Sequence, residues 1–333
     1  MTRVIIIIGF WKSIDEKMKK SVIIWFTTII VLLALLWINS QFEFFALNFN
    51  GDKTKKDGSF RVMTYNVNAT LGDEDIETLR TGLLREIQKQ SPDILCLQEL
   101  SSRISKVVLP TIDSLFVYKD SMSVKIKPSR YLIFSKRPVR NFKQMSFISQ
   151  IDTLGLDLLK DELQKIKQGM PVFSAEIEVA PNKWITFYSV HLRSSAYSTA
   201  RRSMRENASW LDGLPLYYEN FKIGQKIRNW EADNLRLYLG SLEADDTPVI
   251  IAGDFNDWSG SYCMNTIRDE KYKDAWWEGG LGFGVTYDGW HLKLRLDHIL
   301  YSHHFKLENV YVEKSKFSDH RPLVADFTLI DPH

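Results

Sequence analysis

The chain has 333 residues, of which 44% are hydrophobic and 13% aromatic, enough apolar material for one large α/β domain with a short appendage. Its formal net charge is only +2, and the first 20 residues carry five basic against two acidic side chains. The remainder is therefore close to neutral, which excludes a broad positive surface for a nucleic-acid backbone but not a nucleic-acid substrate. Two cysteines, Cys96 and Cys263, provide neither a disulfide framework nor a CxxC metal site.

An uncharged apolar run, Val22–Ile38, is the first element of the chain. As a helix it spans about 25 Å at about 1.5 Å per residue, close to the apolar thickness of a bilayer. Trp25 and Trp37 lie near its ends, where indoles favour the membrane interface, and a cluster of lysines precedes it. We therefore predict a cytoplasmic segment 1–20, a single-pass transmembrane signal anchor 21–40, a linker 41–59 and an exported domain 60–330, periplasmic or extracellular.

A cleaved signal peptide and a buried core helix are the alternatives for this run. The run is longer than most signal-peptide cores, and Ile38–Gln41 offers no small-x-small cleavage site. An uncleaved anchor is the preferred interpretation.

From Phe60 onward, strand-like runs alternate with helical stretches, which is typical of a layered α/β fold. Asp73–Gln90 spaces its apolar residues by three and four, which predicts an amphipathic helix. Helices are also predicted at Thr199–Leu211 and Gln225–Leu242, and Met145–Gly169 is interpreted as an insertion or lid. The runs predicted as strands are Arg61–Val67, Asp93–Gln98, Tyr131–Ser135, Val172–Val179, Trp184–Leu192, Val249–Gly253, Leu296–Tyr301 and Leu323–Leu329.

Polar residues gather at the ends of these predicted strands, where a scaffold delivers side chains into a cleft. One pair, Asp254 and Asn256, follows a buried strand and is spaced by two, so both side chains lie on one side. The complete set, in chain order, is Asn66, Glu99, His191, Asp254, Asn256, Asp297, Asp319 and His320.

These residue types suit the attack of water on a phosphate ester. A neutral imidazole such as His320 can take a proton from water at pH 7, and Asp297 can fix its tautomer. Asn256 and His191 can hold phosphoryl oxygens as charge redistributes. A hard divalent cation prefers carboxylate and amide oxygens, which are offered by Asn66, Glu99 and Asp319.

Each motif taken alone has a simpler interpretation. A glutamate after a strand can be a surface residue, and Gly-Asp-Phe-Asn can be a turn. Trp276 and Trp277 are interpreted as core residues, with stacking on unpaired bases as the alternative. Arginines that can grip anions, or lie solvated on a helix, are Arg193, Arg201, Arg202 and Arg205; the histidines interpreted as structural or exposed are His291, His298, His303 and His304.

In chain order the motifs resemble those of the endonuclease/exonuclease/phosphatase superfamily, which includes deoxyribonucleases, abasic-site endonucleases, sphingomyelinases and inositol-polyphosphate phosphatases. The resemblance covers about Phe60 to Ile330. The motifs are Tyr-Asn-Val at 65–67, Leu-Gln-Glu at 97–99, Phe-Ser-Lys-Arg-Pro-Val at 134–139, Val-His-Leu at 190–192, Gly-Asp-Phe-Asn at 253–256, Leu-Asp-His-Ile at 296–299 and Ser-Asp-His-Arg-Pro at 318–322.

The resemblance implies a four-layer α/β/β/α sandwich, here with an N-terminal transmembrane helix, and a divalent cation. Mg²⁺ is the expected ion, with Mn²⁺ or Ca²⁺ as alternatives. Asn66 and Glu99 match the principal metal-site pair, and Asp319 matches a metal-site or water-network carboxylate.

The same resemblance implies roles for the other matched residues. Asp254 and Asn256 match residues that position the nucleophile and contact the phosphate. His320 matches the catalytic histidine and Asp297 its orienting partner, while His191 matches a group that contacts the phosphate or aids the leaving group. Either His320 or Asp254 is the general base.

Departures from the pattern bear on the substrate. Abasic-site endonucleases tend to carry an acid at the position of Asn68, so that branch is disfavoured. The stretch 282–287 is interpreted as a cleft-lining loop. We therefore expect a divalent-metal-dependent phosphoesterase acting on a nucleic acid, a phospholipid or a phosphorylated small molecule; a catalytically inactive binding or scaffolding protein on the same fold is the alternative.

Overall fold

The computed structural model describes residues 15–48, 53–67, 76–116, 129–145, 172–194, 214–242, 246–289 and 292–330. The chain divides into two units, Met1–Phe44 and Phe45–His333. The extents predicted for the cytoplasmic segment, anchor, linker and domain stay predictions.

The first unit contains the helix α2 (Glu16–Phe42). Its stretch Lys17–Ser40 is long and apolar enough to cross a membrane by length and composition, with a mean hydropathy of 2.6. The hydroxyls of Thr27 and Thr28 donate to carbonyls one turn back, at 2.9 and 2.8 Å, so these polar groups are satisfied within the helix. A helix that is apolar on all sides favours a lipid or protein environment over water.

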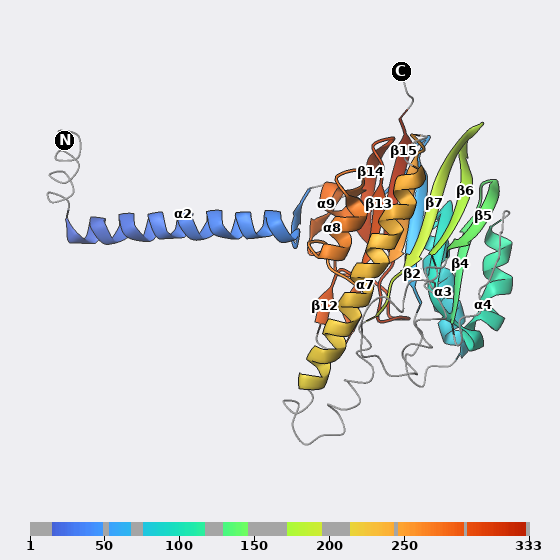
Figure 1. The fold of residues 1–333 in the computed structure, drawn as a ribbon, viewed down its shortest axis with the longest axis horizontal. Helices are drawn as coiled ribbons and strands as arrows, with labels where there is room; N and C mark the ends of the chain where they lie inside the picture. Colours follow the sequence, from blue (N-terminus) through green and yellow to red (C-terminus); the bar gives the residue numbers. More distant parts are fainter. Residues whose placement is uncertain are drawn as a thin grey trace. The chain divides into compact units, whose positions relative to one another are not determined.

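The second unit is built, in its described part, around two central sheets packed face to face (Figure 1). One sheet has the strand order β14-β15-β2-β3-β4, and the other has the order β5-β6-β7-β8-β13-β9. The first sheet contains β2 (Phe60–Asn66), β3 (Ile94–Ser101), β4 (Ser129–Ser135), β14 (Phe305–Val312) and β15 (Leu323–Leu329). The second contains β5 (Val139–Met145), β6 (Val172–Ala180), β7 (Lys183–His191), β8 (Val249–Asp254), β9 (Lys273–Asp274) and β13 (Asp297–Tyr301).

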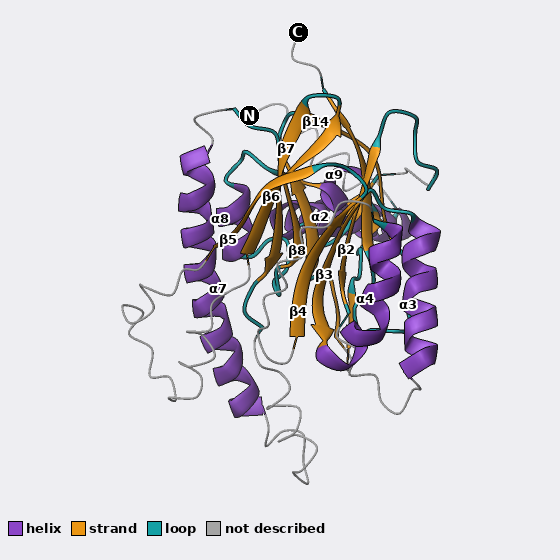
Figure 2. Cartoon of the chain, turned by 90° about the vertical axis from the view of Figure 1, so that its right-hand side faces the viewer, coloured by secondary structure: helices purple, strands orange, loops and turns teal. Residues whose placement is uncertain are grey.

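Helices cover the outer face of each sheet, which completes the four-layer α/β/β/α arrangement and confirms the predicted fold class (Figure 2). On the first sheet these are α3 (Ile76–Gln90) and α4 (Ser102–Leu115); on the second they are α7 (Leu214–Leu242) and α8 (Tyr262–Arg268). The shorter elements are α9 (Ala275–Gly279) and the paired strands β1 (Ala46–Leu47) with β10 (Leu281–Gly282), and β11 (Tyr287–Gly289) with β12 (Leu292–Leu294).

The central strands β2, β8 and β13 are buried at every position, because other layers cover both of their faces. In β2, Phe60 and Val62 join the core between the sheets, whereas Met63 and Tyr65 join the core under α3 and α4. Successive side chains of the strand point to opposite faces, so they pack into two separate hydrophobic layers. This packing fixes the strand ends at which the polar residues lie.

Most predicted strands are present near the predicted bounds, but several elements were not predicted. The helix α4 was not predicted, because it contains Pro110 and proline usually interrupts helices. Strand β14 was missed because it carries the polar residues Glu308 and Asn309; Glu308 is buried against Lys56, whose Nζ lies 2.7 Å away. The predicted helix Thr199–Leu211 and the predicted insertion at 145–169, except for its first residue, lie outside the described residues.

Candidate active site

The centre of the site is a row of three side chains on neighbouring strands of one sheet. His191 at the end of β7 lies beside Asp254 at the end of the parallel strand β8. Asp254 in turn lies directly opposite Asp297, the first residue of the antiparallel strand β13. The register of the sheet therefore places an imidazole and two carboxylates side by side.

Gly253 allows β8 to approach β7 closely just before this row. Its φ is +153°, and a Cβ atom here would lie 1.8 Å from the carbonyl oxygen of Val190. Any larger residue would push the strands apart, so the glycine of the Gly-Asp-Phe-Asn motif has a defined structural role.

The other sheet contributes Asn66 from the end of β2 and Glu99 from within β3. Asn66 Nδ2 donates to Glu99 Oε1 at 3.1 Å and to Asp254 Oδ2 at 2.8 Å. Glu99 Oε1 also lies 3.2 Å from His191 Nε2. These contacts join the two sheets in a single site.

A strand irregularity turns Glu99 into this site. Strand β3 continues to Ser101 rather than ending at Glu99, but its register with β4 shifts between Leu97 and Leu100, and Glu99 has a φ of 54°. A β-bulge of this kind redirects a side chain, and it leaves one residue without a hydrogen-bonded partner on the neighbouring strand.

His320 enters from the segment before β15 and contacts both carboxylates of the row. Its Nδ1 lies 2.8 Å from Asp297 Oδ2, and its Nε2 lies 3.7 Å from Asp254 Oδ2. The ring of Tyr287 packs against the imidazole with centroids 5.0 Å apart. This contact brings one residue of the stretch 282–287 to the site, and the cleft-lining role of that stretch stays a prediction.

Two hydroxyl groups that carried no predicted role hold these residues in place. Ser318 Oγ donates to the carbonyl of Asn66 at 2.8 Å and accepts from the backbone N–H of His320 at 3.0 Å. Thr286 Oγ1 accepts from the backbone N–H groups of Leu296 and Asp297, both at 3.0 Å. Ser318 lies within a recognised motif, but only the three-dimensional contacts reveal its function.

Asn256 orients Asp254 through its backbone. Its N–H donates to Asp254 Oδ1 at 2.8 Å, and its side-chain Nδ2 donates to the carbonyl of Leu192 at 2.9 Å. Asp319 adjoins His320 in the chain, and the charge of Asp319 helps to raise the pKa of that histidine. The structure thus brings the predicted residues into one region, while their individual roles stay predictions.

The electrostatics of the site are dominated by buried carboxylates. Burial opposes ionisation of Glu99, but the hydrogen bond and charge of His191 lower the pKa of Glu99 to about 2. Burial likewise opposes protonation of His320, yet Asp297 and Asp254 raise its pKa to about 10. Burial raises the pKa of Asp254. Without another cation, the imidazoles carry the positive charge that balances these carboxylates.

The same residues have the chemistry to hold a metal ion. The ligand atoms of Glu99, His191 and Asp254 lie within 4.8 Å of one another, as do those of Asp254, Asp297 and His320. A carboxylate that stays ionised and a neighbouring amide suit a hard divalent cation. Such an ion would also balance the negative charge of these carboxylates.

Trp276 and His298 are structural. Trp276 is buried and its Nε1 donates to the carbonyl of Gly282, so it belongs to the core rather than to a base-stacking surface. His298 is fully buried between Asp274 and the carbonyl of Asp257. Cys96 is buried. The positions of Asn68, Arg201, Arg202, Arg205 and His291 lie outside the described residues.

Known proteins resemble this chain in sequence and in fold. Residues 63–320 match the model of the Endonuclease/Exonuclease/phosphatase family. UPF0294 protein VP2298 of Vibrio parahaemolyticus serotype O3:K6 is 31% identical over 144 residues, which are 42% of this chain and 46% of that protein. The match therefore spans less than half of the length of this curated relative.

Solved structures share the fold. The human Nocturnin catalytic domain with bound sulfate superposes with a TM-score of 0.56 at 18% identity, covering 83% of this chain and 96% of that chain. TDP2 from D. rerio, complexed with a single-strand DNA product, gives a TM-score of 0.57 at 15% identity and covers 81% of this chain and 99% of that chain. At these identities the likeness establishes the architecture alone.

Proposed function

This chain belongs to the Endonuclease/Exonuclease/phosphatase family, and from this premise we propose that it is a divalent-metal-dependent hydrolase of phosphoric ester bonds. The observation that carries the proposal is the contact of Asn66 with both Glu99 and Asp254, because it joins a candidate cation site to the row of catalytic side chains. A catalytically inactive scaffold has no need of so many buried ionisable groups in mutual contact.

We assign the cation to Asn66 and Glu99, with Asp319 as a further carboxylate. When bound, the cation polarises phosphoryl oxygens and balances the negative charge that develops during hydrolysis. Mg²⁺ is the expected ion because the donors are oxygens. Mn²⁺ and Ca²⁺ are the alternative ions. The hydrolysis that each supports is compared with the hydrolysis in Mg²⁺.

The protein's own residues move the proton. Asp254 is held in orientation by Asn66 and by the N–H of Asn256, and burial makes it a stronger base than an exposed aspartate. His320 is held by Asp297 and retains a proton between two carboxylates. Of the two candidate bases, we therefore propose that Asp254 accepts the proton of the attacking water, while protonated His320 donates to a phosphoryl oxygen.

His191 completes the set on the opposite side of Asp254. Its pKa is raised by Glu99 and Asp254 despite burial, so it offers an N–H to the phosphate or to the leaving group. The Asn256 side chain is engaged with the carbonyl of Leu192, which favours a positioning role for it.

The substrate is a nucleic acid, a phospholipid or a phosphorylated small molecule. Trp276 is buried and Trp277 packs partly buried against the core, which weakens the stacking argument for unpaired bases. We further propose that α2 anchors the chain in a membrane with the second unit exported, as the lysines before the apolar run indicate. Reporter fusions at each terminus test this topology, and a reporter active on the cytoplasmic side at the C-terminus would contradict it.

The experiment uses the full chain in detergent micelles with an aryl phosphodiester and added Mg²⁺, Mn²⁺ or Ca²⁺. We expect hydrolysis that a chelator abolishes and that added metal restores. Glu99→Gln should lose activity at low metal concentration, whereas Glu219→Gln, the same change on the exposed part of α7, should not. Chelator-insensitive hydrolysis, or equal activity in both variants, would reject the proposal.

A further inference from the structure

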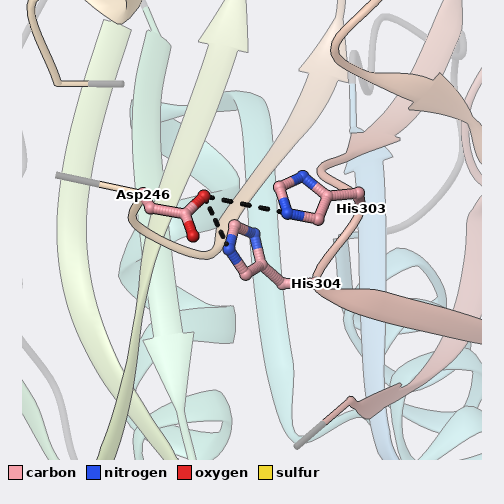
Figure 3. Close-up of side chains that lie close together, drawn as sticks. All are labelled: Asp246, His303 and His304. Atoms are coloured by element: carbon pink, nitrogen blue, oxygen red, sulfur yellow. Dashed lines mark ion pairs between the residues drawn. The ribbon is translucent and has the colours of Figure 1, made fainter. Parts of the chain in front are cut away.

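A second cluster of metal-ligand side chains lies outside the candidate active site. His303 and His304, in the turn between β13 and β14, face Asp246 from the segment before β8 (Figure 3). Asp246 Oδ1 lies 3.2 Å from His304 Nε2 and 3.7 Å from His303 Nε2. The sequence predicted these histidines to be structural or exposed, and only the pairing of β8 with β13 brings them to Asp246.

This cluster is separate from the active site. Asp254 and Asp297 are opposed at one end of the β8–β13 pair, whereas Ile250 and Tyr301 are opposed at the other. The four intervening residue steps correspond to about 14 Å at about 3.4 Å per residue. A ligand bound by His303 and His304 therefore lies beyond contact distance of the catalytic row.

The ring of His304 is held in an orientation that suits a ligand. Its Nδ1 lies 3.0 Å from Ser302 Oγ, which also accepts the backbone N–H of Val249 at 3.0 Å. When Nδ1–H donates to Ser302, the lone pair of Nε2 points at the Asp246 carboxylate. Metal-bound histidines usually donate their other ring N–H to an oxygen in this way.

The Nε2 atom of His304 is placed to act as a ligand. The Nε2 atom is buried and makes no hydrogen bond among the described residues, although it lies 3.2 Å from a carboxylate oxygen. At this distance the two atoms can share either a proton or a metal ion.

The spacing of the three ligand atoms is close to that of a tetrahedral site. Ligand bonds of about 2.0–2.1 Å at tetrahedral angles put neighbouring ligand atoms about 3.3 Å apart. The observed separations from Asp246 are 3.2 and 3.7 Å, and all three atoms lie within 4.8 Å of one another. His303 and Asp246 are exposed, with 73% and 80% of their side-chain surface accessible, so small rotations can close the remaining gap.

A surface cavity adjoins the cluster and provides space for a fourth ligand. The cavity has a volume of about 410 Å³ and is also lined by Glu270 and Thr247. Glu270 or a water molecule can complete the coordination.

We propose that Asp246, His303 and His304 form a binding site for a divalent transition-metal ion of the zinc type. Two imidazoles and one carboxylate select Zn²⁺, Cu²⁺ or Ni²⁺ over the hard Mg²⁺ expected at Glu99 and Asn66. The bound ion joins the β13–β14 turn to the segment before β8. Because it binds the folded chain, it raises the temperature of unfolding.

The test uses the full chain in detergent micelles, purified through a tag without histidine and treated with a chelator. ZnCl₂ is titrated calorimetrically in buffer with excess Mg²⁺, and CoCl₂ reports tetrahedral coordination through its visible absorption. We expect one Zn²⁺ site that His303→Ala, His304→Ala and Asp246→Asn each weaken by at least tenfold. Ser302→Ala should weaken it by about tenfold, because it removes the partner of Nδ1.

Matched controls separate this site from the catalytic one. Asp57→Asn, the same change as Asp246→Asn at another exposed aspartate, should leave Zn²⁺ affinity unchanged, and so should Glu99→Gln. His303→Ala should retain wild-type phosphodiester hydrolysis. If His304→Ala fails to fold, the Zn²⁺ affinity of the His303→Ala variant tests the site, because His303 is exposed. Absence of Zn²⁺ binding to the wild-type chain, or wild-type Zn²⁺ affinity in the His303→Ala and Asp246→Asn variants, would overturn the proposal.

Discussion

Asp254 and Asp297 lie directly opposite each other on the antiparallel strands β8 and β13, and both carboxylates are buried. Two carboxylates at opposed positions repel unless a cation or a hydrogen-bond donor separates them. His320 contacts both, with Nδ1 at Asp297 and Nε2 towards Asp254. The imidazole of His320 thus offsets the repulsion between the two carboxylates. Their negative charges in turn favour its protonated form.

The first prediction concerns the Asp297–His320 contact. Asp297→Asn preserves the size of the side chain but removes its negative charge. That charge raises the pKa of His320 and orients its ring. We expect kcat for a phosphodiester to fall on the order of 100-fold, because a positioned acid or base contributes at least this much. KM should change little. Asp57→Asn is the control, and unchanged kcat in Asp297→Asn would contradict the role given to this pair.

The second prediction concerns the close contact between α3 and the segment before His320. A Cβ atom on Gly82 would lie 2.0–2.4 Å from the ring atoms of Phe317. Gly82→Ala should therefore lower the free energy of unfolding by about 1–3 kcal/mol, despite the better helix propensity of alanine. Activity should fall as well, because Phe317 precedes Ser318 and His320.

Gly240 in α7 provides the matched control for this substitution. The nearest atom to a Cβ there is the flexible guanidinium end of Arg236, 3.1 Å away. Gly240→Ala should leave stability unchanged or raise it by about 0.5–1 kcal/mol. Thermal unfolding of both variants measures the difference, and equal effects would refute the steric argument.

The third prediction concerns a buried ion pair between adjacent strands of the first sheet. Arg61 donates to both carboxylate oxygens of Asp326, at 2.6 and 2.7 Å, and its pKa is raised by this partner against the effect of burial. Asp326→Asn leaves the guanidinium buried without its counter-charge and should cost about 3–5 kcal/mol. Urea unfolding measures this loss.

An exposed ion pair serves as the comparison for Asp326. Lys222 and Glu219 form a pair on the surface of α7, where water screens the interaction. Glu219→Gln should produce no measurable change in stability. A similar loss in the two variants would mean that burial does not determine the contribution of the Arg61–Asp326 pair.

The fourth prediction is a pH dependence that originates at Glu231. Burial raises the pKa of this carboxyl to about 8, although the N–H of Arg193 and the charge of Arg228 act in the opposite direction. In the unfolded chain this carboxyl has its ordinary pKa of 4.5. The folded chain therefore binds the proton more tightly than the unfolded chain does. The resulting stability is fully present below about pH 4.5 and is lost as the pH rises through about 8.

Glu231→Gln tests this dependence, because glutamine keeps the hydrogen-bond acceptor and cannot titrate. Thermal midpoints of the wild-type chain should fall more steeply between about pH 5 and about pH 8.5 than those of Glu231→Gln. Glu219→Gln should keep the wild-type slope. Identical slopes in the wild-type chain and Glu231→Gln would show that Glu231 is already ionised in the folded chain.

The sequence by itself determined the layered α/β class and the apolar helix, and it predicted the candidate site residues. Apolar runs of strand length identify the buried strands, because burial of both faces leaves few positions for polar residues. A polar residue at the end of such a run, as at Asn66 or Asp254, is therefore conspicuous. The order of the motifs then indicated one family, although each motif alone was ambiguous.

Only the tertiary structure decided which of these residues touch. Asn66 and Asp254 are 188 residues apart in the chain, and their contact depends on how the two sheets pack. The opposition of Asp254 and Asp297 is a matter of strand register, in which a shift of one residue would turn every side chain to the other face. The hydroxyls of Ser318 and Thr286, and the meeting of His303 and His304 with Asp246, likewise arise from pairings between distant segments, which local sequence pattern does not encode.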